Sequence, residues 1–372
     1  YDGDDDLDIY FVNGAPLSGV DTGLKPTNEL YRNDGDWVFT DVTKAAGVGD
    51  LGYGLGVATA DYDNDGATDI YVSNFGRNVL YHNNGDGTFT NVAASVQVTD
   101  GDKVGAGVSF TDMDADGNLD IYLANYVKFS FNNHKPHMHK GVPAYISTLV
   151  YEPQSDSLLR NLGDGTFADV SDQTGITIQQ APGMGVLSCD YDDDGDADIF
   201  VCNDLHSNFL WENDGSGRFK NVALVAGTAF DLNGVAQGSM GIDAADVDND
   251  GLIDFHVTSF AQEWSTLYHN LGGGFFEDNT RLSSAGSGTF PHVTWGNCFA
   301  DFDNDGYQDI FVATGHLDDN IHLRDKTTSY ALPNVLLHNQ GAGKFVDVSK
   351  QAGLGMQRSY SSRGTAVGDL DS

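Results

Sequence analysis

The sequence Asp-Tyr-Asp-Asn-Asp-Gly-Ala-Thr-Asp spans residues 61–69 and places carboxylates at positions 1, 3, 5 and 9 of one short stretch. Hard cations such as Ca²⁺ prefer about six to eight oxygen ligands from carboxylates, backbone carbonyls and water. Gly66 at position 6 allows a sharp turn, so that the carbonyl of Ala67 can also face the centre. Without a cation these carboxylates would repel one another. The stretch therefore predicts a calcium-binding loop.

The same spacing occurs in four further stretches, each with glycine at position 6. In every copy the predicted ligands are the aspartates at positions 1, 3, 5 and 9 and the backbone carbonyl at position 7. They are Asp61, Asp63, Asp65, Ala67 and Asp69; Asp112, Asp114, Asp116, Asn118 and Asp120; Asp190, Asp192, Asp194, Asp196 and Asp198; Asp246, Asp248, Asp250, Leu252 and Asp254; and Asp301, Asp303, Asp305, Tyr307 and Asp309. Solvated polar turns are the alternative, but turns do not need four aspartates at fixed offsets.

These stretches differ from an EF-hand, whose loop of about twelve residues ends in a bidentate Glu between two helices. Position 12 is apolar in every copy: Val72, Leu123, Val201, Val257 and Val312. Residues 56–60 and 70–72, on either side of the first copy, are typical of strands. Glycine-rich nonapeptide repeats of a calcium β-roll are absent from the sequence. We therefore expect each calcium loop to join two β-strands.

Composition limits the classes of partner. The 372 residues include 55 acidic and 18 basic side chains, a net charge of −37, and five bound Ca²⁺ ions would still leave about −27. This charge argues against nucleic acid and anionic membranes as partners. No apolar stretch reaches the roughly 18 residues of a membrane span, so membrane insertion is not expected. An aromatic content of 11% and 46 glycines exclude a disordered acidic tail and favour short strands with tight turns.

A second motif alternates with the first, and its clearest copy is Leu-Tyr-His-Asn-Asn-Gly-Asp-Gly-Thr-Phe-Thr-Asn-Val at residues 80–92. Its relatives lie at residues 30–42, 159–170, 210–222, 267–279 and 337–348. Asn-Gly and Asp-Gly favour the positive φ of a hairpin turn. The repeating unit is therefore strand A, calcium loop, strand B and a C–D hairpin. Repeats of about 50 to 60 residues with four strands predict an all-β fold, a β-propeller of four-stranded blades.

The two ends of the chain carry partial loops. Residues 1–9 lack the first aspartate and have Asp5 where glycine is usual, whereas residues 364–372 match a strand A and the first half of a loop. The predicted terminal ligands are Asp2, Asp4, Asp8, Asp369 and Asp371. Either the C-terminal strand completes the N-terminal blade in a ring of six, or both ends belong to a ring of seven. We expect one propeller domain over residues 1–372, trimmed at both ends.

Two long connections interrupt the repeats. Residues 125–156 form an insertion in the third repeat, with His134, His137 and His139 either as ligands for a transition metal or as solvated loop residues. Residues 316–333 form the second connection. Long loops on a rigid scaffold are where recognition tends to occur.

The three cysteines are Cys189, Cys202 and Cys298, an odd number that leaves at least one thiol unpaired. We expect small buried residues on strands. A Cys189–Cys202 disulfide is the alternative, although the two would lie about three positions out of register in a simple hairpin.

The alternation of the two motifs resembles the FG-GAP/VCBS repeats of integrin-α-like propellers. Residues 334–348 and 238–246 (Gly-Ser-Met-Gly-Ile-Asp-Ala-Ala-Asp) are most similar to the propeller region of the cartilage acidic protein (ASPIC/UnbV) family. The resemblance covers nearly the whole chain. It implies a seven-bladed, calcium-stabilised extracellular propeller with five full calcium sites and up to seven in total, usually followed by a small C-terminal domain.

These observations favour a binding, adhesion or matrix module that recognises a protein or glycan outside the cell or at its surface, with the periplasm as the alternative location. A propeller enzyme or accessory domain acting on carbohydrate is the second hypothesis. The sequence has no G-x-S-x-G, H-E-x-x-H or P-loop motif, so we expect no enzymatic activity unless scattered histidines converge. Those histidines are His206, His256, His292, His316 and His322. The third hypothesis is a structural subunit of an extracellular fibre that self-associates through calcium.

Overall fold

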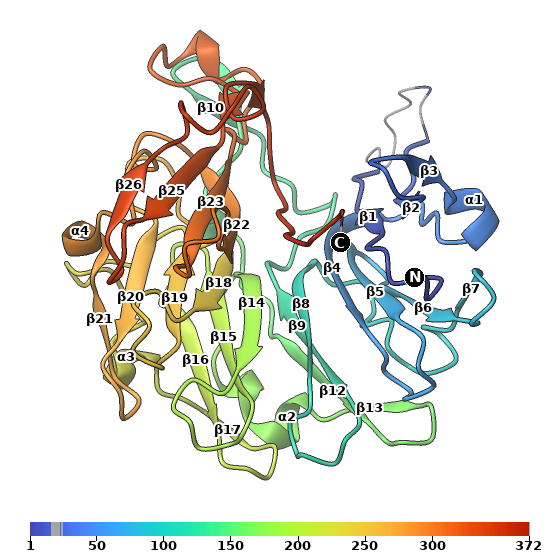
Figure 1. Cartoon of the computed structure of the whole chain (residues 1–372). Helices are drawn as coiled ribbons and strands as arrows, with labels where there is room; N and C mark the ends of the chain where they lie inside the picture. The colour runs from blue at the N-terminus through green and yellow to red at the C-terminus, as the bar shows by residue number, and fades with distance from the viewer. Residues whose placement is uncertain (16–22, 24, 372) are drawn as a thin grey trace.

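The computed structural model describes residues 1–15, 23 and 25–371, which form an all-β propeller with six blade sheets (Figure 1). The first blade has three strands, β1 (Ile9–Phe11), β2 (Glu29–Asn33) and β3 (Phe39–Asp41). Each of the five other blades is a four-stranded antiparallel sheet in which strands A, B, C and D are neighbours in that order. The predicted unit of strand, loop, strand and hairpin is thus confirmed.

The strands of the four-stranded blades have the following bounds. Blades two and three are β4 (Tyr53–Ala60), β5 (Asp69–Phe75), β6 (Val79–Asn83) and β7 (Phe89–Asn91), then β8 (Gly105–Thr111), β9 (Asp120–Asn125), β12 (Ser157–Asn161) and β13 (Phe167–Asp169). Blade four is β14 (Gly183–Cys189), β15 (Asp198–Asn203), β16 (Phe209–Asn213) and β17 (Phe219–Asn221). Blades five and six are β18 (Ile242–Ala245), β19 (Asp254–Val257), β20 (Thr266–Asn270) and β21 (Phe276–Asp278), then β22 (Thr294–Ala300), β23 (Asp309–Thr314), β25 (Val335–Asn339) and β26 (Phe345–Asp347).

The remaining elements are short and lie in the connections. Two small two-stranded sheets are formed by β10 (His137–His139) with β11 (Val142–Ala144), and by β24 (Leu332–Pro333) with β27 (Ser359–Tyr360). One-turn helices follow strand D in several blades: α1 (Thr43–Ala46), α2 (Ser171–Thr174), α3 (Ala223–Ala226) and α4 (Thr280–Ser283). Short 3₁₀ turns are η1 (Thr148–Val150), η2 (Ile176–Ile178) and η3 (Ile321–Leu323).

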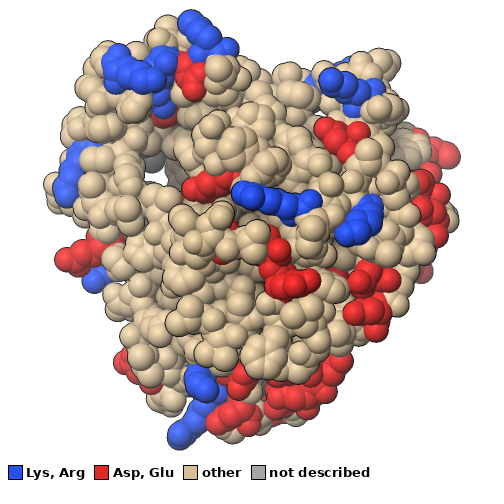
Figure 2. Space-filling model, turned by 90° about the vertical axis from the view of Figure 1, so that its left-hand side faces the viewer, with Lys and Arg blue, Asp and Glu red and all other residues tan. Residues whose placement is uncertain are grey.

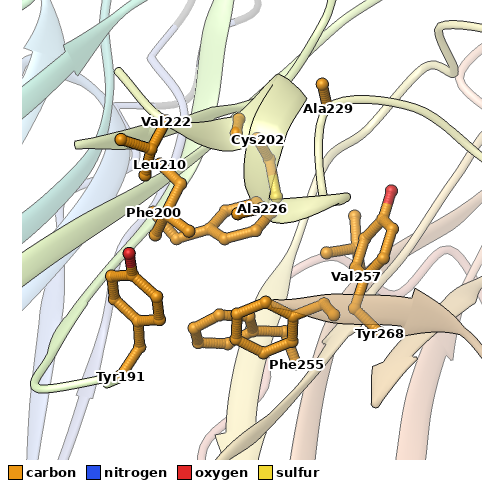
Figure 3. Close-up of a cluster of buried hydrophobic side chains, with 12 residues drawn as sticks. Tyr191, Phe200, Cys202, Leu210, Val222, Ala226, Ala229, Phe255, Val257 and Tyr268 are labelled. Atoms are coloured by element: carbon orange, nitrogen blue, oxygen red, sulfur yellow. The ribbon is translucent and has the colours of Figure 1, made fainter. Parts of the chain in front are cut away.

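The core lies between neighbouring blades rather than inside any single sheet. Strands β9 and β15 are buried along their whole length because both faces of the sheet pack against other blades. Figure 3 shows one such cluster, in which the rings of Phe200 in blade four and Phe255 in blade five lie 5.0 Å apart. Cys202 is buried in this cluster, and the structure has all three cysteines as free thiols. The expectation of unpaired cysteines on strands is confirmed, and no Cys189–Cys202 disulfide forms.

Glycines on the inner strands let successive blades approach closely. A β-carbon added to Gly107 would lie 2.3 Å from the carbonyl oxygen of Met184 in the next blade. The same clash recurs at the equivalent position of each successive blade: Gly56 with Ala106 at 2.1 Å, Gly185 with Met240 at 2.4 Å, Gly241 with Trp295 at 2.2 Å and Gly296 with Arg363 at 2.8 Å. The obstacle is backbone, so it cannot rotate away. Glycine is therefore required at these positions by space.

The last of these contacts places the C-terminal segment, residues 363–370, beside the inner strand of blade six, although the segment itself is not assigned as a strand. The N–H of Gly296 donates to the carbonyl of Arg363 at 2.7 Å, beside β22. Figure 1 shows the segment, in dark red, ending next to β1 and β4. The sheet of β1 gains no fourth strand among residues 1–15, 23 and 25–371.

A repeated hydrogen bond shows which blade the segment belongs to. In blade two the side-chain amide of Asn83 donates to the carbonyl of Tyr1, at position 2 of the preceding blade's loop, at 2.8 Å. The equivalent amide of Asn33 donates to the carbonyl of Leu370 at 3.0 Å. Tyr1 and Leu370 thus hold position 2 of two different loops. The C-terminal segment occupies a blade position between blades six and one and does not complete blade one.

Candidate metal centres

The five aspartate-rich stretches form the turns between strands A and B, hereafter the A–B loops (residues 61–69, 112–120, 190–198, 246–254 and 301–309). In blade two, Ala60 pairs with Asp69, so position 9 is the first residue of strand B. The corresponding pairs in other blades are Thr111 with Asp120, Cys189 with Asp198, Ala245 with Asp254 and Ala300 with Asp309. The predicted placement of each loop between two strands is confirmed.

Backbone N–H groups fold each A–B loop around its aspartates. In the first loop the carboxylate of Asp61 accepts from the N–H of Asp65 at 3.0 Å and from that of Gly66 at 2.9 Å. Asp65 then accepts from the N–H of Ala67 at 2.8 Å. The other four loops repeat all three bonds. The glycine at position 6 has φ near +90° in the first loop, a conformation that glycine adopts without strain.

The residue at position 4 also has a left-handed backbone conformation, which was not predicted from the sequence. Asn64, Ala115, Asp193, Asn249 and Asn304 all have φ between 54° and 61°. Asparagine and aspartate tolerate this conformation better than most residues. The frequent Asn at position 4 was the available signal.

The aspartate at position 9 is the buried anchor of each site. Asp69 is fully buried, and its two oxygens accept from the N–H of Tyr62 at 3.2 Å and from that of Asn83, at the end of strand C, at 2.8 Å. Burial raises the pKa of Asp69 to about 6 and those of Asp120 and Asp198 to about 7, against the lowering effect of these hydrogen bonds. Burial also raises the pKa of the Asp254 carboxyl. Each anchor would be more easily ionised with a cation beside it.

In three A–B loops, the aspartate at position 3 has a carboxylate oxygen without a hydrogen-bond partner. Asp114, Asp192 and Asp248 each have one buried carboxylate oxygen that accepts no hydrogen bond in the described part of the chain. In the second loop, ligand atoms of Asp112, Asp114 and Asp120 all lie within 4.8 Å of one another. Orphaned buried oxygens gathered in this way fit a hard divalent cation, which prefers carboxylate and carbonyl oxygen.

A side chain from strand C borders each loop, and the sequence analysis missed it. In three blades it is histidine: the Nδ1 atoms of His82, His269 and His338 lie 3.2 Å from Asp63, 2.9 Å from Asp254 and 3.2 Å from Asp309 respectively. In blade four, Glu212 accepts from the hydroxyl of Tyr191 at 3.3 Å. In the sequence, this bordering side chain belongs to the residue just before the last Asn of the strand C motif, such as the His of Leu-Tyr-His-Asn.

Blade three differs because Arg160 occupies this strand C position. An Nη2 atom of Arg160 lies 2.6 Å from Asp114 and 3.5 Å from Asp116. A fixed positive charge thus already neutralises part of this loop. The five loops share a backbone but differ in the charge that faces them.

The terminal partial loops share only some of the hydrogen bonds of the full A–B loops. Asp4 accepts from the N–H of Asp6 at 3.1 Å and Asp8 accepts from the N–H of Asn33 at 2.9 Å, the bonds expected of positions 5 and 9. Burial, followed by the neighbouring Asp4 and Asp8, raises the pKa of Asp2. Asp369 accepts from the N–H of Asp371 at 3.4 Å on the separate C-terminal segment.

The histidines outside the A–B loops have different surroundings. His137 and His139 are exposed on β10, whereas the ring of His134 lies 6.1 Å from that of Phe129. Buried His256 contacts the side chain of Asn297 at 3.0 Å, and His316 lies beside Phe260 with ring centres 6.1 Å apart. Their surroundings do not test the transition-metal hypothesis for His134, His137 and His139, which stays a prediction.

Comparison with known proteins gives a family match. The pattern that defines FG-GAP-like repeats matches residues 1–72, 61–123, 190–257 and 246–312. No curated protein matches the chain. Among the described residues, no helix has the length and apolar character needed to cross a membrane.

Several solved structures are similar to this chain at low sequence identity. An Agrocybe aegerita lectin, solved to explain specific recognition of non-reducing terminal N-acetylglucosamine, has a TM-score of 0.50 and 20% identity over 87% of this chain and 73% of its own. AofleA from Arthrobotrys oligospora has a TM-score of 0.42 and 12% identity over 92% of this chain and 86% of its own. A Bacillus licheniformis rhamnogalacturonan lyase has a TM-score of 0.38 and 15% identity, over 79% and 50% of the two chains.

Proposed function

Because the chain belongs to the family of FG-GAP-like repeat proteins, we propose that it is a calcium-stabilised β-propeller that binds a protein or glycan partner outside the cell. The observation that carries this proposal is the repeated geometry of the five A–B loops, each with the same backbone bonds and the same aspartate positions. Extracellular modules use calcium sites with dissociation constants of about 10⁻⁴ to 10⁻³ M. Calcium supplies the positive charge that lets each buried anchor ionise.

Within each loop, this chain's residues would divide the work of holding the ion. The aspartates at positions 1, 3, 5 and 9 and the carbonyl at position 7 supply oxygen. The N–H bonds to positions 1, 5 and 9 orient three of those carboxylates beforehand, as described above for Asp61, Asp65 and Asp69. Because strand B starts at position 9, ion binding would lock the turn to the sheet of its blade.

The recognition part of the proposal rests on the scaffold. Strands fixed by inter-blade packing present connections at the ring faces, and such loops commonly carry recognition. The Agrocybe aegerita lectin of similar fold recognises a sugar, which supports a glycan as one class of partner. We propose no enzymatic activity.

A glycan and extracellular-protein array probed with labelled protein tests this function. We expect selective binding in millimolar calcium that is lost in EDTA and restored when calcium is added back. Heat-unfolded protein is the matched control for non-specific adhesion. Absence of any selective binding by folded, calcium-loaded protein would contradict the proposal.

Arg160 should make the loop at residues 112–120 the weakest of the five calcium sites. Replacing it in Arg160→Gln removes the positive charge that lies 2.6 Å from Asp114. At low calcium concentration we therefore expect the variant to bind about one more ion per chain than the wild type, because the unpaired carboxylates need another cation. Calcium titration by calorimetry measures this number.

The control is Arg281→Gln, which removes the same charge from α4, away from the A–B loops. If Arg160→Gln and Arg281→Gln change calcium binding equally, long-range charge explains the effect and the local argument is wrong.

A further inference from the structure

A polar cavity of about 470 Å³ lies on the face of the ring opposite the A–B loops. Because strands A and B are joined at one end of each blade, the connections between strands B and C emerge at the other end. Three such connections line the cavity: Lys140 from blade three, Phe260 and Gln262 from blade five, and Arg324, Lys326 and Thr328 from blade six. The volume is within the range of about 300–1,000 Å³ that is usual for small-ligand sites.

The walls of the cavity are tied together across the ring. The N–H of Tyr145 in the blade-three insertion donates to Asp318 of blade six at 3.2 Å. The side-chain amide of Asn320 in turn donates to the carbonyl of Pro143 at 2.9 Å. These bonds join the two longest connections in the chain. The site is therefore assembled from distant repeats and largely preformed.

Positive charge collects here in a strongly acidic protein. Residues 125–151 of the insertion contain three lysines and no acidic residue, whereas the whole chain has a net charge of −37. Lys140, Arg324 and Lys326 line the cavity together with one carboxylate, Asp325. Figure 2 shows Lys and Arg side chains around the top edge of the molecule, near a hollow, and Asp and Glu side chains gathered at the lower right.

The cations differ in their partners. Arg324 is paired with Asp318, whereas Lys140 has no ion pair among the described residues. Thr327 donates two hydrogen bonds to Asp325, and these bonds lower the pKa of that carboxyl. Burial, assisted by the positive charges of Arg324 and Arg363, lowers the pKa of His316 to about 4. His316 is therefore neutral at physiological pH, and the lysines remain to attract an anion.

Groups suited to a sugar lie beside these charges. The side chain of Phe260 is 37% exposed, which leaves ring surface for the apolar face of a pyranose. The hydroxyl of Thr328 is buried without a hydrogen-bond partner in the described part of the chain. A buried hydroxyl in that state loses free energy unless a ligand or water bonds to it. Gln262 adds an amide that can both donate and accept.

We propose that this cavity binds an acidic saccharide, a sugar unit bearing a carboxylate or sulfate group. Lys140 and Lys326 would contact the anionic group, Phe260 would stack on the sugar ring, and Thr328 and Gln262 would bond its hydroxyls. The overall charge of the chain disfavours a polyanion as large as nucleic acid, because such a ligand would extend past the basic rim. This inference rests on the glycan-binding form of the function proposed above.

Calorimetric titration of calcium-loaded protein tests the cavity with defined probes. The acidic probes are a hyaluronan tetrasaccharide, which carries carboxylates, and a heparin disaccharide, which carries sulfates. A chitin tetrasaccharide is the neutral probe, and a short polyglutamate peptide presents negative charge without sugar. We expect at least one acidic saccharide to bind at least tenfold more tightly than the neutral saccharide and the peptide. Equal affinity for the neutral saccharide or for the peptide would overturn the proposal.

Substitutions inside and outside the cavity distinguish binding at this site from binding elsewhere on the surface. Lys140→Ala/Lys326→Ala should weaken binding of the acidic saccharide at least tenfold, and Thr328→Val should weaken it without any change of charge. The control Lys44→Ala/Lys350→Ala removes the same charge at exposed positions outside the cavity and should leave affinity unchanged. Unchanged melting temperature and calcium content confirm that each variant is folded.

Different results would overturn the saccharide site in the cavity and the proposed binding function of the propeller. If the cavity variants keep the glycan-array binding of the wild type, the propeller binds elsewhere and only this inference is overturned. If the wild type binds no glycan or protein at all, the proposed function fails as well.

Discussion

Removal of calcium should lower the melting temperature of this protein by about 10 °C. With a dissociation constant near 10⁻⁴ M and about 1 mM calcium, each site would stabilise the native state by about 1.4 kcal/mol. Five such sites together give roughly 7 kcal/mol, and each kcal/mol shifts the midpoint of a 372-residue domain by about 1.3 °C, because the unfolding entropy is about 2.1 cal/mol/K per residue. Scanning calorimetry with calcium and with EDTA measures the difference. Magnesium at the same concentration is the control, because Mg²⁺ demands a smaller octahedral site.

The pH dependence of the melting temperature is a second test of calcium binding. The carboxyls of Asp120 and Asp198 have a pKa of about 7 in the native state, raised by burial from 3.8. Between pH 3.8 and about pH 7 the native state binds more protons than the unfolded state. The two carboxyls therefore contribute fully to the free energy of unfolding below about pH 4, and this contribution is lost as pH rises through 7. The calcium-free protein should therefore melt at a higher temperature at pH 5 than at pH 8.

Calcium should reverse that trend, because protons compete with the ion for the same carboxylates. Calcium-loaded protein should melt at a higher temperature at pH 8 than at pH 5. An unchanged melting temperature after thorough chelation, at either pH, would mean that the A–B loops hold no stabilising ion.

Gly107→Ala should unfold the ring or destabilise it by about 3 kcal/mol or more. Its β-carbon would lie 2.3 Å from the carbonyl oxygen of Met184, and this backbone atom can move only if two blades separate. Gly185→Ala should have a similar effect, since Met240 is 2.4 Å away. Chemical denaturation in saturating calcium gives the change in the free energy of unfolding.

Gly364→Ala is the matched control. It occupies the same place in the inner-strand motif, yet a β-carbon there meets nothing within 4 Å. The free energy of unfolding should therefore change by only about 0.5 kcal/mol or less. A loss as large as that of Gly107→Ala would show that another inner strand packs against residues 363–370, contrary to the arrangement described here.

Much of the fold was predictable because its signals are local. The aspartate offsets with glycine at position 6 specify a turn from nearby N–H groups, and the Asn-Gly and Asp-Gly pairs specify the hairpins. Gly66 and its equivalents have positive φ as that pattern requires. Repetition of both motifs at similar intervals was enough to predict four-stranded blades. The calcium ligands themselves remain predictions from chemistry.

The tertiary structure alone decided what lies against what. His82, Arg160 and Glu212 border the A–B loops because strand C pairs with strand B, a contact between residues far apart in the chain. The place of residues 363–370 was undecided in the sequence because the inner-strand motif is identical in either ring. Asn33 resolved it through its bond to Leu370. The cavity likewise joins connections of three blades, whose meeting depends on ring closure, and no local pattern encodes that closure.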